Sequence, residues 1–93
     1  MIKIRKDIHV PVICCPKENG AVDVIVPDLH ITISGKDYVE AIANAIFYVS
    51  SIYYFNLERD YLLPFSATYS EVEDSLGKYP KGSFATLINI ADN

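Results

Sequence analysis

Apolar and polar residues alternate in short segments in the first third of the chain and again near its end. Alternation with β-branched residues is typical of half-buried strands. The predicted strands are residues 8–15, 22–26, 31–34 and 83–90. Asn19-Gly20 favours the positive φ angles of a tight hairpin turn, and Pro27-Asp28 favours another turn. The first three strands are therefore expected to form an antiparallel meander.

The segment from Asp37 to Glu58, DYVEAIANAIFYVSSIYYFNLE, has a helical period instead. Asp37 followed by Glu40 matches a helix-capping pattern, and Pro64 cannot continue a helix. Further on, Ser70 and Glu73 have the same spacing and predict a cap for one short helical turn before the last strand.

This order of elements, β-β-β-α-(short α)-β, predicts an α+β fold with a mixed four-stranded sheet and the long helix packed on one face. A right-handed crossover would place the last strand parallel to the first strand and beside it. We expect residues 1–93 to form a single domain.

The long helix has more apolar residues than one buried face requires. On a helical wheel, one broad side is expected to face the core: Tyr38, Ala41, Ile42, Ala45, Val49, Ile52 and Phe55. A narrow polar arc carries Glu40, Asn44, Ser51 and Glu58. The remaining arc predicts an interface with a second copy or another protein: Ala43, Ile46, Phe47, Ser50 and Tyr54. The alternative is that the connection after the helix folds back over this arc.

The formal net charge of −4 and the pI of about 4.9 disfavour direct binding to nucleic acid and suit a basic protein partner. The candidate charged contacts to such a partner are Asp23, Asp28, Glu71, Glu73 and Asp74. The alternative for the acidic run at 71–74 is an ordinary solvated surface. No apolar run is long enough to span a membrane, and the first residues do not resemble a secretory signal, so a cytoplasmic location is expected.

The sequence contains no pattern typical of a catalytic, metal-binding or cofactor-binding site. Cys14 and Cys15 are adjacent, which is too close for ordinary disulfide geometry, and two reduced thiols are expected. His9 and His30 lack the spacing of metal ligands. We therefore expect a protein that is not an enzyme.

Four fragments together resemble the HicB antitoxin family: VPDL after the hairpin, DYVEAIANA at the helix start, LLPFS in the connection and GSFATLINI at the last strand. The resemblance covers nearly the whole chain. It implies a partial ribonuclease H-like fold without nuclease activity, which binds a small basic mRNA-cleaving toxin and masks its active surface.

The chain departs from the family pattern in two places. After Leu29 the usual PGC-type turn is replaced by HIT, and the sequence stops at Asn93 without the DNA-binding segment that many members carry. The resemblance therefore implies the N-terminal domain alone, and the negative net charge predicts no direct DNA binding. The apolar arc of the long helix predicts a homodimer or larger assembly. The alternative is a stand-alone homo-oligomeric domain, for example from a mobile element, that binds or inhibits a different host protein.

Overall fold

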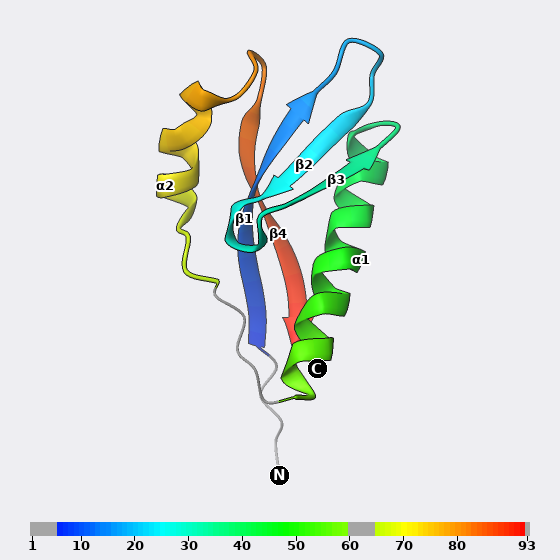
Figure 1. Ribbon diagram of the computed structural model, residues 1–93, viewed down its shortest axis with the longest axis vertical. Coiled ribbons are helices and arrows are strands. Elements are labelled where there is room, and N and C mark those ends of the chain that lie inside the picture. Colours follow the sequence, from blue (N-terminus) through cyan, green and yellow to red (C-terminus); the bar gives the residue numbers. More distant parts are fainter. Residues whose placement is uncertain (1–5, 60–64, 93) are drawn as a thin grey trace.

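In a computed structural model, which describes residues 6–59 and 65–92, the chain forms an α+β fold with a long helix, a short helix and a four-stranded sheet (Figure 1). The strands are β1 (Lys6–Pro16), β2 (Val22–Val26), β3 (Ile31–Gly35) and β4 (Phe84–Asp92). The helices are α1 (Tyr38–Leu57) and α2 (Tyr69–Asp74), with short 3-10 helices η1 (Pro27–Leu29) and η2 (Ser75–Lys78). All four strands and both helices lie close to the predicted segments.

The sheet has the order β3-β2-β1-β4, and every pairing in it is antiparallel. The prediction that β4 lies beside β1 is confirmed, but the prediction of a parallel β4 in a mixed sheet is wrong. The reason is visible in Figure 1: α1 carries the chain to the far end of the sheet, and the segment with α2 carries it back again. The chain therefore enters β4 at the end where β1 finishes.

The β1–β2 turn is built on Gly20, whose φ of 89° lies in the left-handed region. The Gly20 amide donates to the Lys17 carbonyl, and the Lys17 amide donates to the Ala21 carbonyl at 2.8 Å. The next turn, η1, ends at His30 with φ 54° and ψ 40°. A non-glycine residue rarely adopts this conformation, although histidine does so more readily than most residue types. The first residue of the HIT sequence, His30, is thus the left-handed residue that ends η1.

The start of α1 is fixed by Asp37, whose Oδ1 accepts from the Glu40 amide at 2.8 Å. The strand before it approaches the helix very closely at Gly35. A Cβ added to Gly35 would lie 2.6 Å from Ala41 Cα and 2.8 Å from the Glu40 carbonyl carbon. Glycine is therefore required where β3 meets the first turn of α1.

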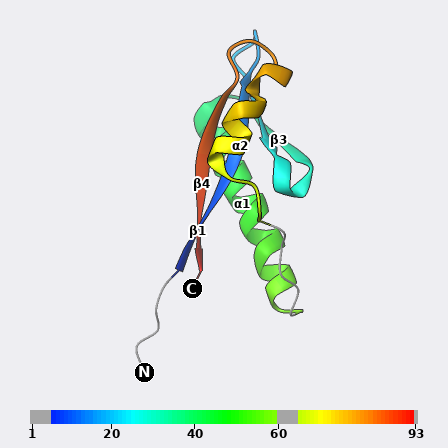
Figure 2. The ribbon, with the colours of Figure 1, turned by 90° about the vertical axis from the view of Figure 1, so that its left-hand side faces the viewer.

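The two helices lie on opposite faces of the sheet, so the molecule has a buried cluster on each face (Figure 2). The larger cluster lies under α1, where Ala41, Ala45 and Val49 are fully buried against the strands. The smaller cluster lies under α2 around Ile13 and Val72. The second helix covers a face that the sequence analysis had left without a helix.

The cap of α2 differs from the predicted one. Thr68 is the N-cap: its side chain accepts from the Glu71 amide at 3.2 Å, and Glu71 accepts from the Thr68 amide. Ser70 and Glu73 match the same sequence pattern two residues later but do not form the cap. Starting the helix at Tyr69 places Val72 in the cluster under α2, which explains why the earlier pair is used.

Candidate protein-binding surfaces

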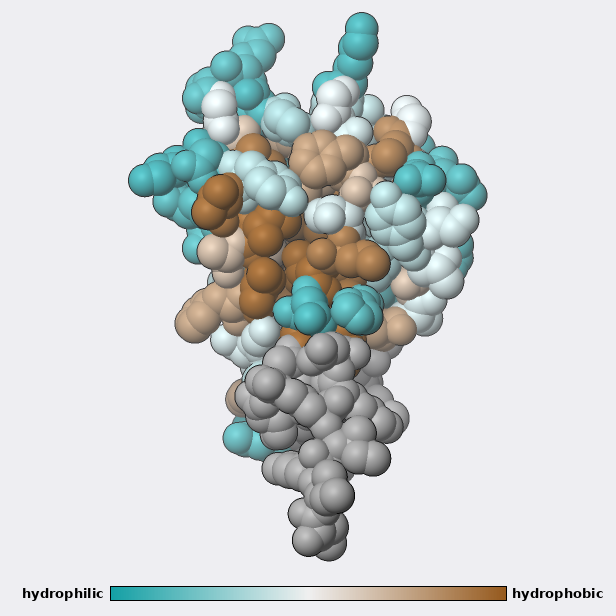
Figure 3. Space-filling model, turned by 180° about the vertical axis from the view of Figure 1, so that it is seen from behind, coloured by the Kyte–Doolittle hydropathy of each residue, from teal (hydrophilic) through white to brown (hydrophobic). Residues whose placement is uncertain are grey.

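Several large apolar side chains are exposed, and most belong to α1 or β4. They are Val39 (76% exposed), Phe47 (72%), Tyr48 (57%), Phe55 (56%), Leu87 (46%), Tyr38 (43%), Tyr69 (40%) and Phe84 (40%). Seen from behind, apolar side chains gather in the middle of the face that α1 and β4 share, with polar side chains around them (Figure 3). Contiguous exposed apolar surface of this kind is typical of protein-binding sites.

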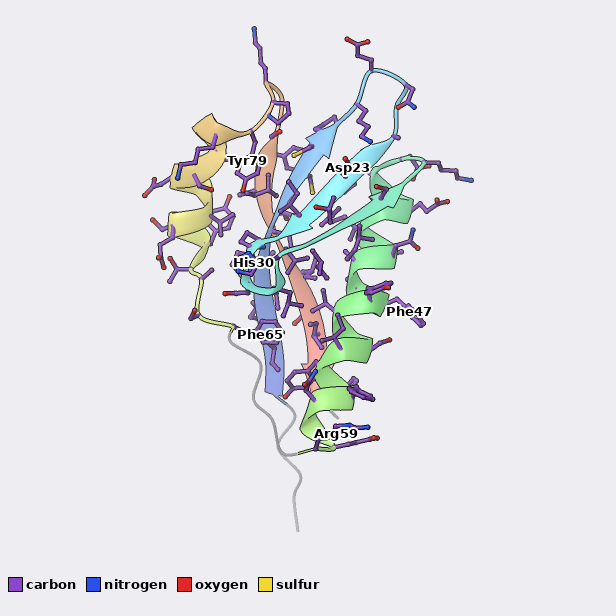
Figure 4. The ribbon with its side chains drawn as sticks, in the orientation of Figure 1. Asp23, His30, Phe47, Arg59, Phe65 and Tyr79 are labelled. Carbon is purple, nitrogen blue, oxygen red and sulfur yellow. The ribbon has the colours of Figure 1, made fainter. Side chains whose placement is uncertain are left out.

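The predicted interface arc of α1 is exposed only in part. Phe47 points away from the sheet (Figure 4), and Ala43 is exposed beside it. Ile46, a member of this predicted interface arc, packs against the core under α1. Ser50 and Tyr54 are half-buried, and the Tyr54 ring packs edge-on against Tyr53.

Two residues assigned to the core side of α1, Tyr38 and Phe55, are exposed instead. Tyr38 contacts the Phe84 ring at the start of β4, with 5.7 Å between the ring centroids. Phe55 lies near the end of α1, beyond the reach of the shorter strands β2 and β3 (Figure 1), and the Arg59 guanidinium sits 4.3 Å from its ring centroid. The helix extends past β2 and β3, so the side of its last turns that these strands leave uncovered contributes surface rather than core.

Open grooves lie along α1. One is lined by Phe47, Tyr48, Ser51, Ile52, Phe55 and Asn56. The other lies between α1 and β3 and is lined by Ile31, Thr32, Ile33, Ser34 and Tyr48. Tyr48 belongs to both, so the two grooves form one mostly apolar track. Tyr48 was assigned to none of the three predicted arcs of the helix, so its place in both grooves was not predicted from the sequence.

The two candidate acidic contacts outside α2 have partners within the domain. Asp23 accepts a 2.7 Å hydrogen bond from the Ser34 hydroxyl and lies 3.2 Å from the Lys17 ammonium. The hydrogen bond from Ser34, together with Lys17, holds the pKa of Asp23 below its ordinary value. Asp28 accepts from the backbone amides of Ser66 and Ala67 and so fastens the segment before α2 to η1.

The other three acids belong to α2. All three are exposed, but the Glu71 carboxylate is engaged in the helix cap. A hydrogen bond to Glu73 and its negative charge raise the pKa of Tyr69, although the geometry also places the Tyr69 hydroxyl 3.4 Å from the Ala85 carbonyl. The single hydroxyl proton serves one acceptor at a time, and the carboxylate is the stronger acceptor. Glu73 and Asp74 are thus the acids of α2 that a partner meets directly.

Within residues 6–59 and 65–92, no group of three or more His, Cys, Asp or Glu side chains is arranged to hold a metal ion. Cys14 and Cys15 are buried thiols on opposite faces of β1, and burial with the neighbouring Cys15 raises the pKa of Cys14 to about 11. A protonated, buried thiol is a poor nucleophile. In the same described part of the chain, no helix is long and apolar enough to cross a membrane.

Comparison with known proteins identifies the fold. The structure is similar to the crystal structure of the Burkholderia pseudomallei antitoxin HicB, with a TM-score of 0.74 and 18% sequence identity. The match covers 88% of this chain and 61% of the antitoxin chain. No protein-family model matches the sequence, and no curated protein matches it. The chain therefore has a HicB-like fold and spans less than two thirds of the length of that antitoxin.

Proposed function

We propose that this chain is a HicB-like antitoxin domain that binds and masks a small basic mRNA-cleaving toxin and performs no chemistry of its own. The observation that carries the proposal is the structural match to the HicB antitoxin over 88% of the chain. The net charge of −4 favours a basic partner electrostatically, and the described residues offer no arranged metal-ligand cluster.

The proposal assigns the partner an apolar anchor on α1 and charged residues on α2, which lie on opposite faces of the sheet. Phe47 is the anchor, because it is the most exposed aromatic side chain of the domain's described part and lies between Ala43 and the apolar track around Tyr48. Ile46, Ser50 and Tyr54 border it as half-buried neighbours. Glu73 and Asp74 supply exposed negative charge on α2 that steers a basic protein.

The decisive experiment co-expresses the chain with a small basic toxin encoded beside its gene and measures the recovery of arrested growth, together with direct binding of the purified pair. Rescue with binding supports the proposal. If such a toxin exists and the chain neither binds it nor restores growth, the antitoxin function is excluded, and inhibition of a different host protein becomes the better explanation.

The role of each surface is separable by kinetics. Asp74→Lys should slow association with the toxin by roughly threefold or more at low salt and much less at high salt, because exposed charges act mainly on the association rate. Glu18→Lys is the matched control, since Glu18 is an exposed acid outside α2, at the β1–β2 turn. Phe47→Glu should instead speed dissociation, because a desolvated apolar anchor is lost. Equal effects of Asp74→Lys and Glu18→Lys would remove α2 from the partner surface.

A further inference from the structure

The two outer strands of the sheet, β3 and β4, differ in length and in the hydrogen-bonding groups that their free edges expose. Among the described residues, β3 pairs with β2 alone and β4 pairs with β1 alone. Strand β3 has five residues, whereas β4 has nine. From Phe84 to Ile90 the sequence of β4 is FATLINI, with no charged residue, proline or glycine. Natural edge strands usually carry such residues because these discourage pairing with another chain.

The direction of the backbone groups on β4 follows from the hydrogen bonds at the first hairpin. The Lys17 amide bonds to Ala21, and hydrogen-bonded pairs alternate along an antiparallel ladder, so Cys15 and Ile13 face β2. The intervening residues of β1 then face β4, where Val10 pairs with Ile88 and Val12 with Thr86.

It follows that the amide and carbonyl groups of Leu87 and Asn89 point away from β1, toward the free edge. Pro11 stands opposite Leu87 and has no N–H to donate, which agrees with this assignment. The Ala85 carbonyl also points outward and lies within 3.4 Å of the Tyr69 hydroxyl, so α2 covers one end of the edge.

The same alternation makes β3 the poorer edge. Its outward groups belong to Thr32 and Ser34, and the Ser34 carbonyl already accepts from the Asn44 side chain at 3.2 Å. Strand β3 therefore has a shorter edge with one acceptor occupied. Strand β4 presents the longer run of open groups, beside the apolar side chains that gather in the middle of the face in Figure 3.

We infer that β4 pairs antiparallel with β4 of a second copy of this chain, joining two sheets into one across a twofold axis at Ile88. In this register Leu87 of each copy faces Asn89 of the other, and both residues exchange their outward amide and carbonyl groups. A second copy fits because a chain with net charge −4 meets no like charge along Phe84–Ile90. A basic partner would meet no acidic side chain along this segment of β4, whereas α2 carries exposed acidic side chains.

This inference goes beyond the proposed function, and its test requires no toxin, so either can fail alone. We would measure the oligomeric state by analytical ultracentrifugation at about 1–100 μM. The wild type should be dimeric. Asn89→Pro should raise the dimer dissociation constant about tenfold or more, because both copies lose an outward donor. Thr32→Pro is the matched control on the β3 edge and should leave the dimer intact, with circular dichroism confirming the fold of both variants.

A cross-linking arm remains informative if Asn89→Pro does not fold. Leu87→Cys and Asn89→Cys variants are purified separately, mixed and oxidised. The proposed register predicts a disulfide-linked dimer in the mixture and little in either variant alone, because each new thiol faces the other position across the axis. A monomeric wild type at 100 μM would overturn the inference. Cross-linking that is equal in all three samples, or loss of the dimer in Thr32→Pro, would do the same.

Discussion

Gly35→Ala tests how closely the sheet and α1 must approach. The new Cβ would lie 2.6 Å from Ala41 Cα and closer still to the Ala41 nitrogen, whereas ordinary carbon contacts begin near 3.4 Å. These atoms are helix backbone and cannot rotate aside, so β3 and α1 must separate by about 1 Å beside the fully buried Ala41. Overpacking of this kind costs about 2–3 kcal/mol. With a urea m-value of about 1–1.5 kcal/mol/M, the unfolding midpoint should fall by about 2 M.

The matched control is Gly77→Ala. An added Cβ at Gly77 meets nothing within 4 Å, and Gly77 does not have a positive φ. The free energy of unfolding should therefore change by less than about 0.5 kcal/mol. Urea titration followed by circular dichroism measures both variants. If Gly35→Ala unfolds within 0.5 kcal/mol of the wild type, the close approach is not a steric requirement and the reasoning fails.

Two further outcomes are expected. Asp28→Ala should cost about 1–3 kcal/mol and should remove hydrogen-exchange protection from the Ala67 amide, because the carboxylate that accepts from this amide is lost; retained protection there would contradict the tethering role. The lowered pKa of Asp23 stabilises the fold above its ordinary value of 3.8, and this contribution is lost as the pH falls through the lower folded-state pKa. Urea midpoints measured from pH 6 to pH 2.5 should thus decline more steeply for wild type than for Asp23→Asn, and parallel curves would refute the assignment.

The sequence predicted the strands and α1 well because these depend on local signals. The Gly20 turn, the Asp37 cap and the period-two segments each act within a few residues. The direction of β4 depends instead on how many times the chain passes along the length of the sheet between β3 and β4. The segment with α2 adds a second pass along the sheet before β4. Because α2 has only six residues, its sequence shows no periodicity from which packing on the second face could be predicted.

The surfaces were harder to predict for a similar reason. A helical wheel assigns faces as though the neighbouring sheet were as long as the helix, and this placed Phe55 in the core. The structure shows that β2 and β3 end before the last turns of α1 (Figure 1). The edge of β4 also required the ladder register, because the same alternating sequence is compatible with an inner or an outer strand.

The adjacent cysteines have a consequence for how the domain opens. Cys14 lies in the cluster under α1 and Cys15 in the cluster under α2, although they are neighbours in the chain. Cooperative units of a protein can detach at different free energies, and a buried thiol reacts only while the unit above it is open. Timed alkylation read by mass spectrometry would therefore follow the two layers separately from one peptide. Because the cluster under α2 has fewer buried residues, Cys15 should be alkylated before Cys14. The two thiols therefore report separately on local unfolding at the two faces of β1.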